Sequence, residues 1–269
     1  MNALRRRSLI PLAWTLLAAW ALVGCGSLGR TGNALRQTDR EAHGGHHSGH
    51  VTWTPADQAH WTAVHFPGKR PTQFKLVRHE LRPGTQADAA QSVSMLRHKL
   101  HVPAEQLGTL KFSWLVPELI AGADMGLRHA DDSPVRVVLA FEGDRRQFSA
   151  RDAMLSELSL ALTGEPLPYA TLMYVWCNHR PVGSVIANPR TGRIQKIVVE
   201  SGADRTQRWL EYERDVRADF RQAYGEDPGA LVAIGLMTDS DNTQTTTRAW
   251  YGDIQLIGPQ AAPHALRKK

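Results

Sequence analysis

The sequence has few cysteines, no membrane-spanning apolar run and none of the common catalytic signatures. Cys25 and Cys177 are its only cysteines. If Cys25 is taken up by a covalent modification, Cys177 has no second cysteine with which to form an internal disulfide. The longest apolar run, residues 9–23, is shorter than the roughly 20 residues that cross a bilayer. Nucleophile elbows, phosphate-binding glycine loops, paired-cysteine motifs and His-Glu-x-x-His patterns are all missing. These absences argue against disulfide-rich scaffolds and the familiar motif-bearing enzyme classes.

The first 24 residues are typical of a bacterial secretion signal. Three arginines at positions 5–7 precede the apolar run, which ends in Leu-Val-Gly before Cys25. This LVGC sequence resembles the lipobox of bacterial lipoproteins, in which the cysteine becomes the first mature residue and carries the lipid. The resemblance implies lipidation at Cys25, and Gly26, in place of Asp, implies transport to the outer membrane of a Gram-negative host. We therefore expect a lipoprotein signal peptide over residues 1–24 and a cell-envelope protein facing the periplasm or the surface. The lipid anchor would be its only membrane contact.

The mature chain would be only mildly basic. The whole sequence has 32 Lys and Arg against 26 Asp and Glu; without the three arginines of residues 1–24, 29 basic residues remain, a net charge of +3. Nucleic-acid binding needs basic residues clustered on one face, and no such cluster is visible. We therefore expect no nucleic-acid partner.

Residues 25–52 are predicted to be a flexible, His-rich tether. This stretch is rich in Gly, Ser, Thr and Asn, lacks periodicity and has little apolar surface. Its four imidazoles, His43, His46, His47 and His50, could capture a transition-metal ion, since neutral imidazole suits zinc, copper or nickel. The alternative is a solvated tail that binds metal incidentally, because no Cys or carboxylate at fixed spacing completes a site.

Residues 53–258 are predicted to form a single, mostly β domain, followed by a basic tail over residues 259–269. Many short apolar or alternating runs are bounded by Pro, Gly or Asp, which argues for an antiparallel β-sandwich or jelly roll rather than a parallel sheet. Pro189-Arg190-Thr191-Gly192 is typical of a hairpin turn. The expected strands cover residues 72–81, 91–96, 107–116, 135–141, 170–178, 193–201, 231–238 and 250–256.

Two helices are expected to pack on the sandwich. The first covers residues 152–162, with Asp152 as N-cap, Gly164 just past its end and an apolar side. The second covers residues 206–224, with aromatic and apolar residues at helical spacing as its packing stripe.

Several long blocks give the sequence a family resemblance. LKFSWLV at 110–116, DDSPVRVVLAFEGD at 131–144, PYATLMYVWCN at 168–178 and NPRTGRIQKIVVESG at 188–202 resemble the bacterial family catalogued as the domain of unknown function numbered 3047. The family carries no established activity, so the resemblance implies a domain and not a mechanism. AWYGDIQL at 249–256 is similar to the closing strand of jelly-roll carbohydrate-binding modules of the galactose-binding type, which implies a galactose-binding-like sandwich.

Acids and aromatic residues beside the predicted strands favour a carbohydrate or cell-envelope polymer as partner. An aromatic ring packs under the apolar face of a sugar while polar groups bind its hydroxyls. The domain is expected to bind without catalysis. A glycan hydrolase or lyase using two groove carboxylates and a scaffold that binds another protein through the helix at 206–224 remain alternatives. The expected ligand-binding residues are Trp114, Tyr174, Trp176, Asn178, Trp250, Tyr251 and Asp253.

The loop between the last two strands offers oxygens at alternate positions. Asp239, Asp241 and Asn242 could bind calcium, although the loop lacks the Gly and the distal Glu of an EF-hand. Alternatively, these residues hydrogen-bond backbone N–H groups in an ordinary turn. Calcium is therefore a possible cofactor here, and no other is expected with certainty.

Overall fold

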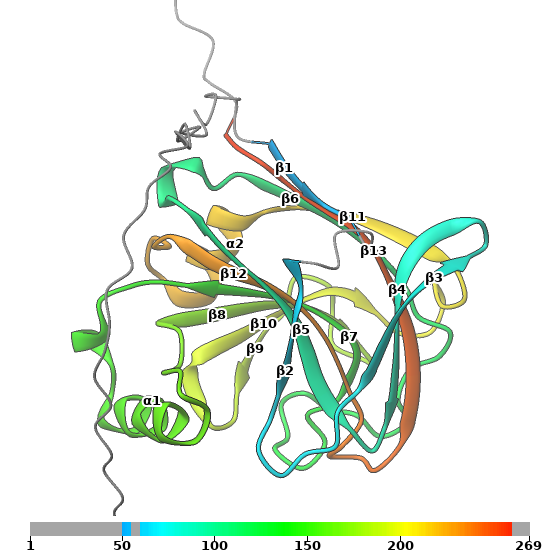
Figure 1. Ribbon diagram of the computed structural model, residues 1–269, viewed down its shortest axis with the longest axis horizontal. Coiled ribbons are helices and arrows are strands. Elements are labelled where there is room, and N and C mark those ends of the chain that lie inside the picture. Colours follow the sequence, from blue (N-terminus) through cyan, green and yellow to red (C-terminus); the bar gives the residue numbers. More distant parts are fainter. Residues whose placement is uncertain (1–49, 55–59, 260–269) are drawn as a thin grey trace, which may run out of the picture. The chain divides into compact units, whose positions relative to one another are not determined.

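A computed structural model describes residues 50–54 and 60–259 of the chain, and these residues form two β-sheets (Figure 1). All of these described residues belong to one compact unit. The predicted signal peptide, most of the predicted tether and the predicted basic tail lie outside the described residues, as do Cys25, His43, His46 and His47. Among the described residues, no helix combines the length and apolarity that crossing a membrane requires.

The first sheet has six strands and is entirely antiparallel. Its order is β11-β6-β13-β4-β3, and β1 pairs with the last part of β13. The strands are β1 (His50–Trp53), β3 (Gln73–His79), β4 (Arg82–Ala90), β6 (Thr109–Leu115), β11 (Trp209–Asp215) and β13 (Thr246–Ile257).

The second sheet has seven strands in the order β2-β5-β12-β7-β8-β10-β9. It is mixed, because β10 pairs parallel to β8 while the other pairs are antiparallel. The strands are β2 (Thr62–His65), β5 (Val93–Val102), β7 (Ser133–Phe141), β8 (Ala170–Cys177), β9 (Val185–Asn188), β10 (Thr191–Ser201) and β12 (Leu231–Asp239).

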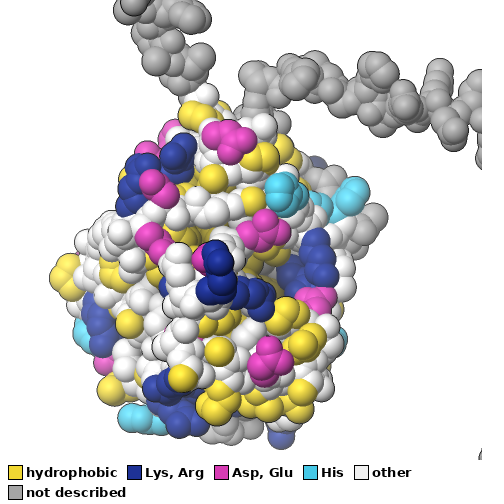
Figure 2. Space-filling model, turned by 90° about the vertical axis from the view of Figure 1, so that its left-hand side faces the viewer, with side chains coloured by type: hydrophobic (Ala, Val, Ile, Leu, Met, Phe, Trp, Pro, Cys, Tyr) yellow, Lys and Arg dark blue, Asp and Glu magenta, His cyan; other side chains and the backbone are white. Residues whose placement is uncertain are grey.

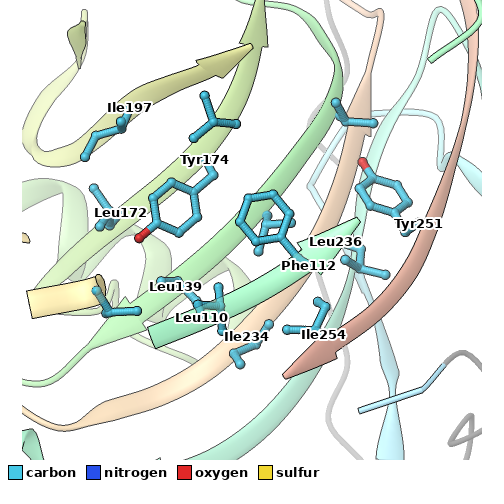
Figure 3. Packing of buried hydrophobic residues seen from close by; sticks show 14 of the residues in the cluster. Leu110, Phe112, Leu139, Leu172, Tyr174, Ile197, Ile234, Leu236, Tyr251 and Ile254 are labelled. Atoms are coloured by element: carbon cyan, nitrogen blue, oxygen red, sulfur yellow. The ribbon is translucent and has the colours of Figure 1, made fainter. Parts of the chain in front are cut away.

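Alternate side chains of both sheets form the main core (Figure 3). Phe112 and Tyr251 of the six-stranded sheet share the cluster with Leu139, Tyr174 and Ile234 of the seven-stranded sheet. Successive side chains of a strand point to opposite faces, so every second residue of these strands is buried between the sheets. The mostly β sandwich predicted from sequence is confirmed, with the parallel β8–β10 pair as a departure from a purely antiparallel fold.

The strand that ends the domain contains a bulge that the alternation alone did not predict. The register of β13 against β6 shifts between Tyr251 and Ile254, so both residues reach the core. A strict two-residue alternation would place Tyr251 on one face of β13 and both Trp250 and Ile254 on the other, and only the opposition of Tyr251 and Trp250 holds. A bulge inserts an extra residue and reverses the facing of everything beyond it.

The predicted helix over residues 206–224 is wrong in its first half. Residues 209–215 form β11, whose alternation places Leu210 toward the core and Glu211 away from it. Asp215 then caps α2 (Val216–Tyr224) by accepting hydrogen bonds from the N–H groups of Arg217 and Ala218.

The first predicted helix is present, with its faces reversed. α1 (Ala150–Thr163) begins after Ser149, which caps it in place of Asp152, and ends at Gly164 in the left-handed conformation. Its buried residues are Asp152 and Ser156. Two short 3-10 turns, η2 (Ala104–Gln106) and η3 (Arg145–Gln147), complete the described helices.

Candidate functional site

A hollow of about 370 Å³ lies on the outer side of the six-stranded sheet. Arg248 and Trp250 point outward from β13, because Ala249 and Tyr251 between and beside them face the core. Their partners in the ladder are Asp88 and Gln86 of β4. We call this feature the Trp250 hollow; its lining is Asp88, Pro117, Glu118, Thr246, Thr247, Arg248 and Trp250.

Trp250 supplies the aromatic wall of the hollow. Its ring stacks on His79, with the ring centroids 4.2 Å apart and an angle of 21° between the planes. The residue is only 8% exposed, so its surroundings fix most of the indole and only a small part of the ring surface is open to a ligand. Trp250 Nε1 and Thr247 Oγ1 are both buried and have no hydrogen-bond partner among the described residues. Unpaired buried polar atoms are uncommon in proteins, and of these two only Trp250 Nε1 belongs to an outward-pointing side chain, because Thr247 alternates with Arg248 and faces the core side.

Charged groups of both signs occupy the rest of the wall. Asp88 forms ion pairs with Arg248 and with Lys75, the latter at 3.3 Å, and accepts a hydrogen bond from Gln86 at 2.7 Å. Burial alone would raise the pKa of Asp88, but hydrogen bonds from Arg248, Gln86 and Lys75 lower it below its ordinary value. Asp88 is therefore ionised at neutral pH, and Glu118, which is exposed, contributes a second carboxyl group.

A second aromatic ring lies on the same outer face. The guanidinium carbon of Arg82 lies 4.6 Å from the centroid of the Trp209 ring. A Cβ added at Gly84 would lie 3.2 Å from that ring, and one added at Gly252 would lie 3.4 Å from it. The ring thus lies over two positions where any larger side chain would displace it. Sequence reasoning had assigned Trp209 to a helix and missed this placement.

Four of the aromatic residues predicted to bind ligand are core residues. Trp114, Tyr174, Trp176 and Tyr251 are almost fully buried between the sheets. Tyr174 donates a hydrogen bond to Asp219 at 2.8 Å, and Trp176 Nε1 donates to the carbonyl of Gly202 at 2.9 Å. A ring without an exposed face cannot stack on a sugar, so these four predictions are corrected.

The remaining predicted ligand residues are separated from one another. Trp250 lines the hollow, and Asp253 lies further along β13 and is partly exposed. Asn178 donates a hydrogen bond to the carbonyl of Ile120 at 2.8 Å. Asp88, Glu118 and Arg248 were missed. Arg248 could have been found from its period-two spacing to Trp250, whereas the two acids are brought in by distant segments.

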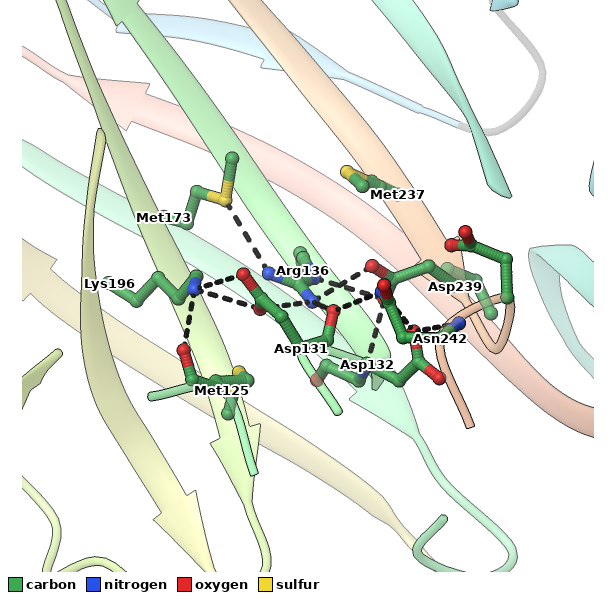
Figure 4. Close-up of polar contacts among 12 residues, drawn as sticks. Met125, Asp131, Asp132, Arg136, Met173, Lys196, Met237, Asp239 and Asn242 are labelled. Atoms are coloured by element: carbon green, nitrogen blue, oxygen red, sulfur yellow. Dashed lines mark hydrogen bonds and ion pairs between the residues drawn. The ribbon is translucent and has the colours of Figure 1, made fainter. Parts of the chain in front are cut away.

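A buried polar network covers one end of the seven-stranded sheet's outer face (Figure 4). Arg136 donates hydrogen bonds to Asp239 at 2.9 and 3.1 Å and to Asp131 at 3.1 Å. Lys196 is completely buried and forms an ion pair with Asp131 at 2.8 Å. It also donates to the carbonyl of Met125 at 2.9 Å. These contacts hold the segment between β6 and β7 against the sheet.

Burial shifts the pKa values of this network. It lowers the pKa of Lys196 to about 8, with Arg136 acting in the same direction and Asp131 opposing. Burial also raises the pKa of Asp239 to about 7; Arg136 lowers it, while the charges of Asp132 and Asp131 add to the rise. Strongly shifted groups often mark functional sites. These side chains are enclosed, however, and the contacts described assign them to holding the fold together.

The predicted calcium loop contributes to the same region. Asp132, Asp239 and Asp241 each offer a carboxylate oxygen, and the three oxygens lie within 4.8 Å of one another. Asp132 accepts hydrogen bonds from the backbone N–H and the side chain of Asn242, and Asp241 pairs with Lys69. Three carboxylates suit a hard cation, while the charges of Lys69 and of the neighbouring Arg136 oppose one. Calcium at this loop stays a prediction, tested by measuring Tm during a calcium titration.

A comparison of the sequence with known protein families identifies the family of this chain. Residues 59–255 match the family described as "Protein of unknown function (DUF3047)". The chain belongs to the DUF3047 family. The match covers most of the described domain, and it confirms the resemblance inferred from the sequence blocks. No curated protein sequence matches the chain.

Solved structures with similar folds include carbohydrate-active proteins. A mannan-recognising carbohydrate-binding module, TmCBM27, has a TM-score of 0.32 at 9% identity, over 78% of this chain and 99% of that one. The xyloglucanase domain of NopAA from Sinorhizobium fredii has a TM-score of 0.40 at 10% identity, over 74% and 93%. The glycoside hydrolase domain of Endo-D from Streptococcus pneumoniae R6 has a TM-score of 0.33 at 8% identity, over 76% of this chain and 22% of that one. At these scores the likeness carries no argument about a ligand.

Proposed function

We propose that the domain binds a carbohydrate at the Trp250 hollow without transforming it. The observation that carries the proposal is the composition of the hollow, in which an aromatic ring stands beside ionised Asp88, Arg248 and exposed Glu118. Sugars combine apolar C–H faces with many hydroxyl groups, so they suit a wall with one ring and several charged hydrogen-bonding groups.

The protonation state of Asp88 favours binding of a glycan over its hydrolysis. A glycosidase needs one carboxylic acid that keeps its proton near neutral pH and a second carboxylate across the scissile bond. Asp88 accepts hydrogen bonds from Arg248 and Gln86 and pairs with Lys75, and its pKa is lowered. It is therefore a poor proton donor and a good fixed acceptor for sugar hydroxyls.

The test is a glycan array probed with the wild-type domain, followed by calorimetric titration of the best oligosaccharide. Arg248→Ala and Glu118→Gln change exposed side chains of the hollow, so their folding should be intact while affinity falls by about tenfold for each lost charged hydrogen bond. Trp250→Phe keeps a ring but removes the indole N–H. Glu213→Gln, which pairs with Lys111 on the same sheet, is the matched control.

Two results would reject this assignment. Unchanged affinity in both Arg248→Ala and Glu118→Gln would remove the hollow as the binding site. Release of reducing ends or unsaturated products from a bound glycan would replace simple binding with catalysis.

We also propose that the chain is a lipoprotein anchored at Cys25 in the outer membrane. The support is the sequence alone: the arginines at 5–7, the apolar run at 9–23 and the LVGC sequence. In cells fed a labelled fatty acid, wild-type protein should carry the label and Cys25→Ser should not. A labelled Cys25→Ser protein would contradict the proposal.

A further inference from the structure

The outward surface of α1 is apolar. Met154 is 62% exposed, Leu158 51% and Leu162 60%. Because they are spaced four residues apart, these three side chains share one side of the helix. Glu157 is the only acidic side chain exposed on this helix. Single exposed apolar residues are ordinary, whereas a group of large ones on one 14-residue helix marks an interaction surface. On the face seen in Figure 2, hydrophobic side chains gather in the lower part, at the level where Figure 1 shows α1.

The polar side of α1 is turned toward the domain by specific contacts. Asp152 accepts hydrogen bonds from Thr191 of β10 and from Ser149, the latter at 2.7 Å. Ser156 accepts a hydrogen bond from Arg145 at 3.1 Å. A surface helix ordinarily buries its apolar side and exposes its polar one. Here hydrogen bonds fix the opposite orientation, so the exposed apolar side is a built feature and not a frayed edge.

Basic residues surround the first turns of α1. Arg151 on the helix, Arg146 just before it and Arg190 next to Thr191 are all exposed. Arg146 is paired with Asp144. An apolar helix side flanked by arginines is the composition that lies at the boundary of an anionic bilayer, with apolar side chains among the acyl chains and guanidinium groups at the headgroups.

The length of the segment between Cys25 and the described domain helps to decide what contacts the apolar side of α1. Under the proposed anchor at Cys25, residues 26–49 can span at most about 85 Å even when fully extended. The domain would then always remain close to a bilayer, which raises the effective concentration of any weak membrane contact. This step rests on the proposed lipidation; the composition of α1 does not.

A second copy of the chain fits this surface less well. A helix of 14 residues is about 21 Å long and about 10 Å wide, so two α1 surfaces cover far less than the roughly 800 Å² per partner of a stable interface. We propose that the apolar side of α1, residues Met154, Leu158 and Leu162, docks on an anionic lipid bilayer and orients the domain there.

The experiment uses residues 44–269, which include every described residue of both sheets, so that neither the apolar run nor Cys25 contributes. The protein is sedimented with phosphatidylethanolamine vesicles containing roughly one-third phosphatidylglycerol. Wild type should bind, and less so with purely neutral phosphatidylcholine vesicles. The double variant Leu158→Glu/Leu162→Glu should bind at least about tenfold more weakly, because it removes two apolar contacts and adds two negative charges. Leu81→Glu, on the turn between β3 and β4 and 88% exposed in wild type, should bind like wild type.

Two results would overturn the docking proposal. The first is no vesicle binding by wild type, with or without a dimer that the double variant makes monomeric. The second is equal vesicle binding by wild type and the double variant. Cooperative thermal unfolding of every variant checks that the fold is intact. The double variant should keep the glycan affinity of wild type, because α1 and the Trp250 hollow share no residue. Measuring this affinity therefore tests the docking proposal separately from the proposed glycan binding.

Discussion

Asp131→Asn should be among the most damaging single polar changes in this domain. Asp131 neutralises Lys196, whose side chain is entirely enclosed, and also pairs with Arg136. After the change, the ammonium group of Lys196 keeps its hydrogen bond to the carbonyl of Met125 but has lost its carboxylate partner. Removing one partner of a buried ion pair costs about 3–5 kcal/mol, because the remaining charge stays desolvated.

Lys196→Met should cost much less than Asp131→Asn. Methionine has a similar length and carries no charge to desolvate, and Asp131 keeps its contact with Arg136. Equilibrium unfolding in urea gives the free energy of unfolding of both variants. A larger loss for Lys196→Met than for Asp131→Asn would refute the reasoning, since it would mean that the lysine contributes more than its burial costs.

The same pair has a pH signature. The pKa of Lys196 is lowered from 10.5 to about 8 in the folded protein, so between these values the unfolded chain binds a proton that the folded chain does not. The free energy of unfolding should therefore rise with pH across this window, and this gain should be lost as the pH falls through about 8. Lys196→Met should flatten the profile there, and an unchanged profile would contradict the assignment.

Two further predictions concern a surface ion pair and a close backbone approach. Glu165 accepts hydrogen bonds from Arg97 and Lys99, which lower its pKa to about 2, so its contribution to the free energy of unfolding is present above pH 4.5 and lost as the pH falls from 4.5 to 2. Glu165→Gln should therefore reduce the acid sensitivity of urea unfolding, by at most about 1 kcal/mol because the side chain is half-exposed. Equal acid sensitivity of wild type and variant would contradict this prediction. A Cβ at Gly229 would lie 2.2 Å from the carbonyl oxygen of Glu142, so Gly229→Ala should lower the free energy of unfolding by about 1–3 kcal/mol. A Cβ at Gly192 would have nothing within 4 Å, so Gly192→Ala should leave that free energy nearly unchanged. Similar losses for the two variants in urea unfolding would contradict the packing argument.

The sequence predicted most of the core strands but not their pairing. Apolar alternation identified β6 and β7, because each buries a regular row of large side chains between the sheets. β4 was missed because its buried residues are small, such as Ala87 and Ala89, and its place depends on neighbours on both sides. Residues 209–215 were read as helix because Trp209, Tyr212 and Val216 also fit a helical spacing, and only pairing with β6 selects the strand.

The candidate site was predictable only in its aromatic part. Trp250 was named from the sequence, but Asp88 reaches it through the pairing of β4 with β13, which joins residues 160 positions apart. Glu118 comes from the segment after β6, whose path the sequence does not specify. Conversely, Trp114 and Trp176 carried the same residue-type signal as Trp250, and only their facing toward the second sheet distinguishes them.

The most direct test of the account is a crystal structure of the domain with a bound oligosaccharide selected on the glycan array. The account predicts a sugar ring in the hollow, in contact with Trp250 and hydrogen-bonded to Asp88, Arg248 or Glu118. A sugar bound on the outer face of the seven-stranded sheet, with the Trp250 hollow empty, would contradict it.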